Sequence, residues 1–417
     1  MATANVTVTN TGVSGKNESN YTFAFGLVSA LFFMFGFITC LNDILLPHLK
    51  ALFTLNYTQA SMVAFCFFGA YFIVSLPAGK LIRRLGYKTG TIIGLCITAL
   101  GCLLFIPAAE LQSYPFFLFG LFILASGITI IQVAVNPYVS ILGPKETASS
   151  RLNLAQAFNS LGTTLAPLFG AALILAGSET STAAQKASAV KGPYLFLTGA
   201  LIFLAVFLWF VKLPTINPPA STSNSENKKI RAEAWHYRHL VFGAIAIFCY
   251  VGAEVAIGSY IVNFLNLPSV MSMPEHEAAK LLAYYWGGAM GGRFIGSVVM
   301  RKAGPARILT LFAVLAAILV IAAMVSTGTF AMVAILSIGL FNSIMFPTIF
   351  TLAIDDLGEH TAAASGILCM AIVGGAIVPL LQGMLADKMG LQQSFFLPIL
   401  CYLFIAHYGY KGHKHAH

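Results

Sequence analysis

Long apolar runs follow one another along almost the whole chain, and short polar segments separate them. A run of about 20 apolar residues is long enough to cross a bilayer as an α-helix. The apolar positions are continuous and do not alternate in short segments, which favours helices over the strands of a β-barrel. The pattern predicts twelve helices, over residues 22–46, 57–82, 88–109, 114–141, 151–176, 193–213, 239–266, 277–302, 306–326, 328–354, 361–386 and 392–410.

The composition supports a membrane protein. Of 417 residues, 58% are hydrophobic and only 9% are charged, whereas a soluble domain has about 25% charged residues. So few charges cannot cover the surface of a soluble protein of this length. The predicted fold class is therefore an all-α polytopic membrane protein embedded in a lipid bilayer, and we expect a monomer. The positive charges lie in short loops and form no basic groove, so no nucleic acid partner is expected.

The longest polar interruption divides the chain into two halves. Residues 214–238 contain three prolines, a Ser/Asn run and a basic cluster, which is typical of a solvated linker. We predict one six-helix bundle over 21–213 and a second over 239–410. Residues 1–20 are expected to form a disordered N-terminal tail, and residues 411–417 a short C-terminal tail.

The two predicted bundles also repeat each other in sequence. Gly69-Ala70 followed by Arg83-Arg84 in the first half corresponds to Gly288-Ala289 followed by Arg301-Lys302 in the second, at nearly constant spacing. An internal repeat of six helices is the plan of the major facilitator superfamily, in which substrate lies midway between the halves.

The distribution of Lys and Arg predicts the orientation in the membrane. If both termini are cytoplasmic, 17 of the 23 Lys and Arg residues lie on the cytoplasmic side, five lie outside and Arg293 lies within a span. Positive charge concentrates on the cytoplasmic side of membrane proteins. We therefore expect a multi-pass protein of the plasma (inner) membrane with both termini inside.

Two acidic residues fall inside or at the end of apolar runs. Asp43 ends the apolar stretch 27–46, and Glu254 lies within the apolar stretch 240–265. An acid at membrane depth costs about 2.5–3.5 kcal/mol on insertion scales, so such residues usually mark ion or substrate pathways. One buried acid in each half suggests that a cation or a proton passes through the protein.

Several polar strings within the apolar helices carry a specific resemblance. The chain resembles the fucose–glucose/galactose–hexose symporters of the major facilitator superfamily. The strings that match are Asn42-Asp43-Ile44-Leu45-Leu46-Pro47, Pro77-Ala78-Gly79, Asn136-Pro137-Tyr138-Val139, Arg151 to Ser160, Tyr250-Val251-Gly252-Ala253-Glu254 and Phe346-Pro347-Thr348-Ile349-Phe350. The resemblance implies a twelve-helix transporter that moves a monosaccharide together with a cation.

Within that family, the acidic positions of this chain are more similar to those of the glucose/galactose branch than to those of the L-fucose branch. The L-fucose branch has acids in its first and fourth helices; the first corresponds to Asp43 and the second to Gln132, which cannot titrate. Glu254 stands where the L-fucose branch has a glutamine. Because the acid of the fourth helix is missing and some members of the glucose/galactose branch couple to sodium, Na⁺ at Asp43 is preferred here over H⁺.

The same resemblance suggests roles for polar side chains along the predicted helices. Asp43 is expected to load the coupling ion, and Glu254 to accept sugar hydroxyls or join the cation site. Alternatively, Asp43 is an interfacial acid paired with Lys50, and Glu254 is a structural partner of Arg293. Amides suit a ring of hydroxyls because they both donate and accept, and aromatic side chains stack on sugar rings. The candidate substrate residues are Asn42, Gln132, Asn136, Gln156, Asn159, Glu254, Trp286 and Asn342.

Three arginines are candidates for gating. Arg83 and Arg84 lie in a segment, residues 79–86, that resembles the loop between the second and third helices of the superfamily, with its usual Asp replaced by Arg83. Arg293 lies in the corresponding helix region of the second half. The alternative is an ordinary basic loop that only fixes orientation.

The sequence therefore predicts a cation-coupled monosaccharide symporter that works by alternating access. The alternatives are a proton-coupled fucose or amino-sugar symporter and a sugar sensor that does not transport. No GxxxxGK nucleotide loop, HExxH string or nucleophile–base pair is present, so neither an enzyme nor a cofactor beyond the coupling ion, Na⁺ or H⁺, is expected.

Overall fold

The computed structural model describes residues 22–40, 57–111, 113–170, 183–214 and 234–414. The helices up to residue 210 form what we call the N-half. They are the first helix Thr22–Cys40, α2 Tyr57–Glu110, α3 Tyr114–Ile141, α4 Ala148–Gly170 and α5 Ala183–Phe210. The predicted tail 1–20 and most of the predicted linker 214–238 lie outside the described residues.

The helices after residue 237 form what we call the C-half. They are α7 Arg238–Asn266, α8 Glu275–Val299, α9 Pro305–Val325, α10 Gly328–Asn342, α11 Met345–Ala353, α12 Thr361–Met370, α13 Gly374–Met389, α14 Leu391–Ser394 and α15 Phe396–His407. Short turns of 3₁₀ or π helix lie at Lys145–Thr147, Gly358–His360, Ala371–Val373 and Tyr408–Gly412.

The described helices make twelve crossings, as the apolar runs predict. Gly86 has a φ of 81°, a conformation that favours glycine, and it divides α2 into two antiparallel crossings. In the C-half, α10 with α11 and α12 with α13 each form one interrupted crossing. The α5 helix begins at Ala183, ahead of the predicted residue 193. The alanine-rich segment before Pro193 has high helix propensity, so the helix extends beyond its apolar run.

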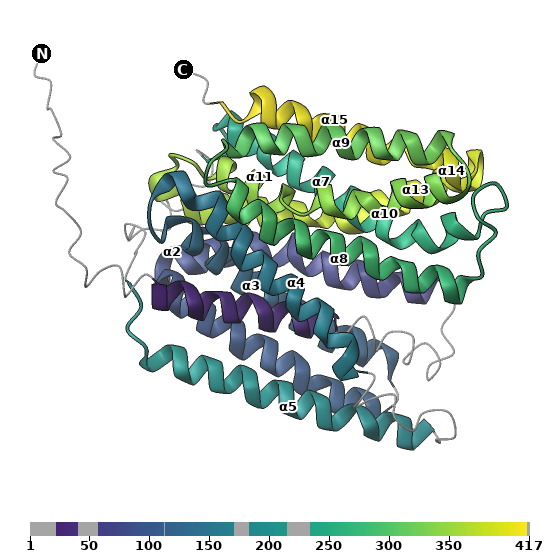
Figure 1. The fold of residues 1–417 in the computed structure, drawn as a ribbon. Coiled ribbons are helices and arrows are strands. Elements are labelled where there is room, and N and C mark those ends of the chain that lie inside the picture. Colours follow the sequence, from purple (N-terminus) through teal and green to yellow (C-terminus); the bar gives the residue numbers. More distant parts are fainter. Residues whose placement is uncertain (1–21, 41–56, 112, 171–182, 215–233, 415–417) are drawn as a thin grey trace, which may run out of the picture.

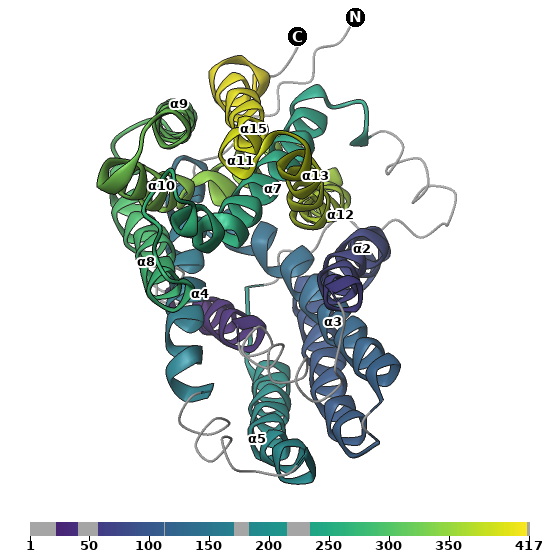
Figure 2. The same ribbon diagram turned by 90° about the vertical axis from the view of Figure 1, so that its right-hand side faces the viewer.

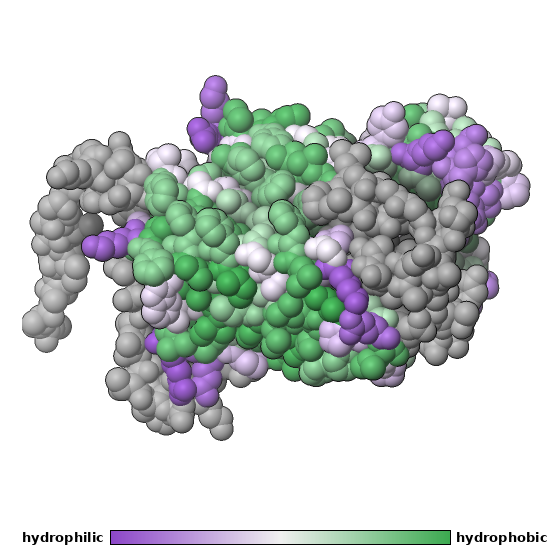
Figure 3. Space-filling model, turned by 90° about the horizontal axis from the view of Figure 1, so that it is seen from below, coloured by the Kyte–Doolittle hydropathy of each residue, from purple (hydrophilic) through white to green (hydrophobic). Residues whose placement is uncertain are grey.

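The surface of the described helices fits a bilayer. Figure 3 shows one face on which hydrophobic residues cover much of the middle, with hydrophilic residues toward the edges. Nine described segments are long and apolar enough to cross a membrane, and one of these contains both crossings of α2. Neither α4 nor α8 is among the nine. These two helices pack against each other across the halves, and α4 buries Ser150, Asn153 and Ser160.

The halves meet along several pairs of helices, of which two have the most extensive contacts. Within the N-half α2 packs on α3 and α5, and within the C-half α8 packs on α10 while α7 packs on α13 and α15. Between the halves, α4 contacts α8 and α2 contacts α12. Figures 1 and 2 show this arrangement, with α4 lying against α8 and with α5 far from the C-half.

One end of the molecule is closed by contacts between the halves. We call it the basic end; it carries Gly86, Lys145 and the loop between α11 and α12. The Lys145 Nζ lies 2.9 Å from the Asp355 carboxylate and 2.8 Å from that of Asp356. The hydrogen bond to Asp355 and, to a smaller extent, the hydrogen bond to Asp356 raise the pKa of Lys145 above its ordinary value. A cavity of about 380 Å³ lies beside this ion cluster, between the two halves.

Both sides of this closure are anchored within their own half. In the N-half, the Arg151 guanidinium donates to the carbonyl oxygens of Ser140 at 2.7 Å and Pro144 at 2.8 Å, which holds the loop that carries Lys145. In the C-half, the His239 ring lies 3.2 Å from the backbone oxygen of Asp355. The ion cluster therefore joins two fixed loops.

Candidate functional site

Glu254 is held within the C-half by its own helix. The Tyr250 hydroxyl, four residues earlier on α7, donates to the Glu254 Oε1 at 2.7 Å. Residues four apart lie on the same face of a helix, so this bond needs no tertiary rearrangement. The Glu254 side chain is 12% exposed. It is therefore largely enclosed by protein while still reaching open space.

Arg293 on α8 is the cation nearest to this acid. Its Nη2 lies 3.9 Å from the Glu254 Oε1, and its side chain is also 12% exposed. Its Nε donates at 3.1 Å to the carbonyl oxygen of Ser343, where α10 ends and α11 has not yet begun. Its Nη1 donates to the Ser160 hydroxyl on α4. A break in a membrane helix leaves carbonyls that need donors, and Arg293 supplies one.

A chain of hydrogen bonds holds the backbone of α7 at Glu254. The Tyr402 hydroxyl on α15 donates to the Asn342 Oδ1 at 2.7 Å, and the Asn342 Nδ2 donates to the Tyr285 hydroxyl at 2.8 Å. Tyr285 in turn donates to the backbone oxygen of Glu254 at 3.1 Å. Asn342, Tyr285 and Tyr402 are fully buried. Asn342, a predicted substrate residue, thus fixes the backbone that carries Glu254.

Trp286 lies close to the same segment of α7. A methyl group placed on Gly258, one turn after Glu254, would lie 3.0 Å from the indole ring. Trp286 is 42% exposed and meets Tyr285 edge to face, with ring centroids 5.0 Å apart. Trp286 and Arg293 are seven residues apart on α8, so they share a helix face. The structure thus places the predicted Glu254 near Arg293, and the predicted Trp286 against α7 one turn away from Glu254.

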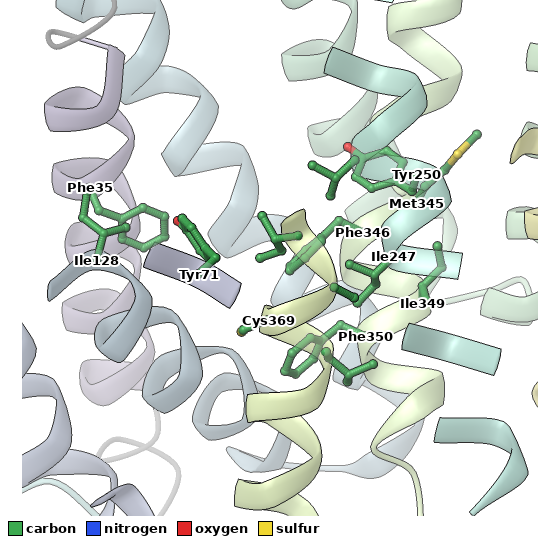
Figure 4. Packing of buried hydrophobic residues seen from close by; sticks show 14 of the residues in the cluster. Phe35, Tyr71, Ile128, Ile247, Tyr250, Met345, Phe346, Ile349, Phe350 and Cys369 are labelled. Carbon is green, nitrogen blue, oxygen red and sulfur yellow. The ribbon is translucent and has the colours of Figure 1, made fainter. Parts of the chain in front are cut away.

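The amides of the N-half lie on α3 and α4. The Gln132 Nε2 donates to the Tyr71 hydroxyl on α2 at 2.9 Å. The Asn159 Nδ2 donates at 3.0 Å to the carbonyl oxygen of Phe32, which ties α4 to the first helix. Figure 4 shows Tyr71 of the N-half and Tyr250 of the C-half among the side chains that pack where the halves meet.

The other predicted amides are buried between elements. Asn153 donates from its Nδ2 to the backbone oxygen of Arg293 at 2.9 Å, so it joins the halves. Gln156 is 8% exposed, and Asn136 is fully buried. Both amide atoms of Asn136 lack a hydrogen-bond partner among the described residues. In this state Asn136 is enclosed by protein.

Two predicted residues cannot be placed. Asn42 and Asp43 lie outside the described residues, directly after the first helix. Of the predicted gating residues, Arg83 is buried and Arg84 is exposed, both near Gly86 at the basic end. Arg293 lies deeper, between Glu254 and Ser160.

Sequence reasoning did not single out several residues that build the site. Tyr250, Tyr402 and Ser160 were not predicted as site residues, although each bonds a residue that was. The spacing of Tyr250 and Glu254 on one helix face was a usable signal. Tyr402 and Ser160 come from other elements, and nothing local in the sequence points to their partners.

The arrangement suits a neutral polyhydroxylated ligand. A carboxylate and amides accept hydroxyl hydrogens, a guanidinium donates, and an exposed indole offers an apolar face. The described residues hold no group of three or more His, Cys, Asp or Glu side chains that would bind a metal ion.

Comparison with known proteins identifies the family. Residues 26–372 match the model of the Major Facilitator Superfamily. The chain is 56% identical to a glucose/galactose transporter of Brucella abortus biovar 1 (strain 9-941), over 96% of each chain. It is 35% identical to an L-fucose-proton symporter of Escherichia coli (strain K12), over 94% of this chain and 93% of the relative.

A solved structure agrees with the fold. The crystal structure of FucP, a major facilitator superfamily transporter in the outward conformation, is similar with a TM-score of 0.88 at 32% identity, over 94% of this chain and 99% of that one. The chain thus has the fold of a membrane carrier and is not an enzyme. This protein belongs to the major facilitator superfamily, and within it to the family of the glucose/galactose transporters and the L-fucose symporter.

Proposed function

We propose that this protein is a cation-coupled symporter that imports a hexose of the glucose or galactose type. The similar Brucella protein is named a glucose/galactose transporter, and identity to it extends over nearly the whole chain. The observation that carries the proposal is the site itself: the Glu254 carboxylate accepts from Tyr250 and lies 3.9 Å from Arg293, and the exposed Trp286 lies against Gly258, one helical turn along α7. An acid beside an aromatic ring matches the hydroxyls and the apolar face of a sugar.

We infer that the structure is the outward-facing state. The ion cluster of Lys145 closes the basic end, and the similar FucP structure is in the outward conformation. With the basic end cytoplasmic, as its positive charge favours, sugar enters from the opposite face. Rocking of the predicted bundles 21–213 and 239–410 then opens the basic end. Both termini are assigned to the cytoplasm of a plasma-membrane protein that acts as a monomer.

The coupling ion is assigned to Asp43. Glu254 already has the Arg293 guanidinium 3.9 Å away, so a cation of the protein itself compensates part of its charge. Gln132 cannot titrate and donates to Tyr71. This leaves Asp43 as the membrane acid to load a cation, and we favour Na⁺. Proton coupling is the second candidate, because the similar Escherichia coli relative is named a proton symporter.

Counterflow of labelled hexoses in proteoliposomes tests this function, with and without a Na⁺ gradient and for Asp43→Asn. We expect exchange of glucose or galactose in the wild type, and accumulation only with an imposed ion gradient. The Asp43→Asn variant should still exchange sugar but not accumulate it. Uptake that persists without Na⁺ and collapses with the pH gradient would replace Na⁺ by H⁺.

The same assay separates the remaining alternatives. L-Fucose and N-acetylglucosamine, offered as competitors, report whether the substrate is a fucose or an amino sugar. Binding of sugar without any counterflow would indicate a sensor. Unimpaired accumulation by Asp43→Asn would reject Asp43 as the coupling residue.

A further inference from the structure

Arg293 is shared between the two halves in this state. Its Nη1 donates to Ser160 of the N-half, while its Nε donates to the Ser343 carbonyl of the C-half at 3.1 Å. The Asn153 amide of the N-half also binds the Arg293 backbone oxygen at 2.9 Å. The side chain and the backbone of Arg293 are therefore both attached to α4.

The ion pair that Arg293 makes with Glu254 is loose by comparison. Its Nη2 lies 3.9 Å from the Glu254 Oε1, beyond the 2.7–2.9 Å of a charge-assisted hydrogen bond. The Glu254 oxygen instead accepts from the neutral Tyr250 hydroxyl at 2.7 Å. Ser160 and Ser343 thus hold the guanidinium away from the carboxylate.

The contacts of α4 with α8 would not survive opening of the basic end unchanged. Ser150 of α4 bonds the Ser297 carbonyl, Asn153 bonds Arg293, and Ser160 bonds Arg293. From Ser150 to Ser160 the helix rises about 15 Å, so these contacts reach from the basic end toward the middle of the membrane. Arg293, Ser343 and Glu254 all belong to the C-half and would move together.

We propose that Arg293 is a positioning residue that sets the sugar affinity of the site differently in the two states. When the basic end is closed, Ser160 holds the guanidinium off Glu254, and the carboxylate is available to sugar hydroxyls. When the halves separate there, Arg293 loses Ser160 and closes on Glu254. The guanidinium then competes with the sugar for the same oxygens and promotes its release at the basic end.

This inference rests on the proposed sugar transport. It predicts that the loss of Ser160 changes the affinity for sugar at one face of the membrane and not at the other, which transport by itself does not require. The half-saturation concentration for sugar exchange is measured from each face, with right-side-out and inside-out vesicles. In Ser160→Ala, Arg293 is free to close on Glu254 in both states. We expect the affinity from the face opposite the basic end to fall about tenfold, the scale of one hydrogen bond to a charged group. The affinity from the basic end should stay unchanged.

Matched variants separate this effect from loosened packing. Ser160→Thr keeps the hydroxyl acceptor and should retain the wild-type asymmetry. Ser149→Ala removes another hydroxyl contact between the halves, the 2.6 Å pair with Thr351, and should leave the affinity from the opposite face unaltered. Ser160→Cys, which has a similar volume and only a weak acceptor, repeats the test if Ser160→Ala does not fold.

The pattern of affinities in these variants tests the positioning role of Arg293. A fall in affinity confined to the face opposite the basic end, restored by Ser160→Thr, supports the positioning role. Unchanged affinity in Ser160→Ala, an equal loss at both faces, or the same loss in Ser149→Ala overturns it. If the wild type exchanges no hexose from either face, the proposed function itself fails, and this inference fails with it.

Discussion

The two most extensive contacts between the halves are built in different ways. Between α4 and α8 the helices are joined by directional bonds, such as those from Arg293 to Ser160 and from Asn153 to Arg293. Between α2 and α12 they are joined by close backbone approach: a methyl group on Gly79 would lie 2.8 Å from the Ala362 carbonyl oxygen. Glycine on both sides allows this distance.

The difference suggests that the two contacts have different roles during transport. Polar side chains can exchange one partner for another, so the hydrogen bonds between α4 and α8 can differ between the two states of the carrier. A contact of small residues has no bonds to exchange and lets helices slide, but it tolerates no added volume. We therefore expect substitutions at the two contacts to fail in different ways.

The largest expected effect on transport is at the glycine contact. Gly79→Val adds volume against the Ala362 carbonyl, and this overpacking should destabilise the closed basic end by about 1–3 kcal/mol. The initial rate of sugar counterflow should fall about tenfold. Gly69→Val is the control. Gly69 lies on the same helix, α2, and a methyl group placed on it would meet nothing within 4 Å. Equal rates in the two variants would show that close approach is not required.

The largest effect on stability is expected at the buried ion pair. Arg293→Met leaves Glu254 without its cation, and breaking a buried pair costs about 3–5 kcal/mol. We expect the lower end of this range because the pair is separated by 3.9 Å. Thermal unfolding in detergent measures the loss. The double variant Arg293→Met/Glu254→Gln should recover part of it, and a double variant no more stable than Arg293→Met would argue against charge compensation.

A smaller effect is expected at the hydrogen-bond chain behind Glu254. Tyr402→Phe removes the donor to Asn342 and leaves its buried Oδ1 without a partner, at about 1–3 kcal/mol. The midpoint of thermal unfolding should fall. Tyr410→Phe serves as the control, since that side chain is 74% exposed. The same midpoint in both variants would show that the chain adds no stability.

The smallest effect on stability is expected at the exposed ion cluster. Lys145→Ala should change the unfolding free energy by about 0–1 kcal/mol, because Lys145 is 57% exposed and solvent screens the pair. The pKa of Lys145 is raised, so its contribution is present below the ordinary lysine pKa and is lost only as pH rises through the raised value. Stability differences between wild type and variant should therefore be constant from about pH 6 to 9. A difference that changes within this range would point to another titrating group.

Some of the site followed from local sequence and some did not. Glu254 and Arg293 stood out as charges within apolar runs, because burial makes such residues costly. Asn342 and Trp286 were singled out as sugar contacts, but Asn342 proves fully buried and bonds Tyr285 and Tyr402. An amide in a membrane helix suits either role, so its partners decide which it has.

The helix count and fold class were determined by the sequence itself, since the bilayer imposes a fixed length and apolarity on each span. The two most polar spans, α4 and α8, were also visible as helices, and the contact between them explains how α4 accommodates its buried Ser150, Asn153 and Ser160. Which side chain meets which was decided by tertiary structure. Arg293 contacts Ser160, 133 positions away, because two helices from different halves cross there, and no local pattern of residues encodes that crossing.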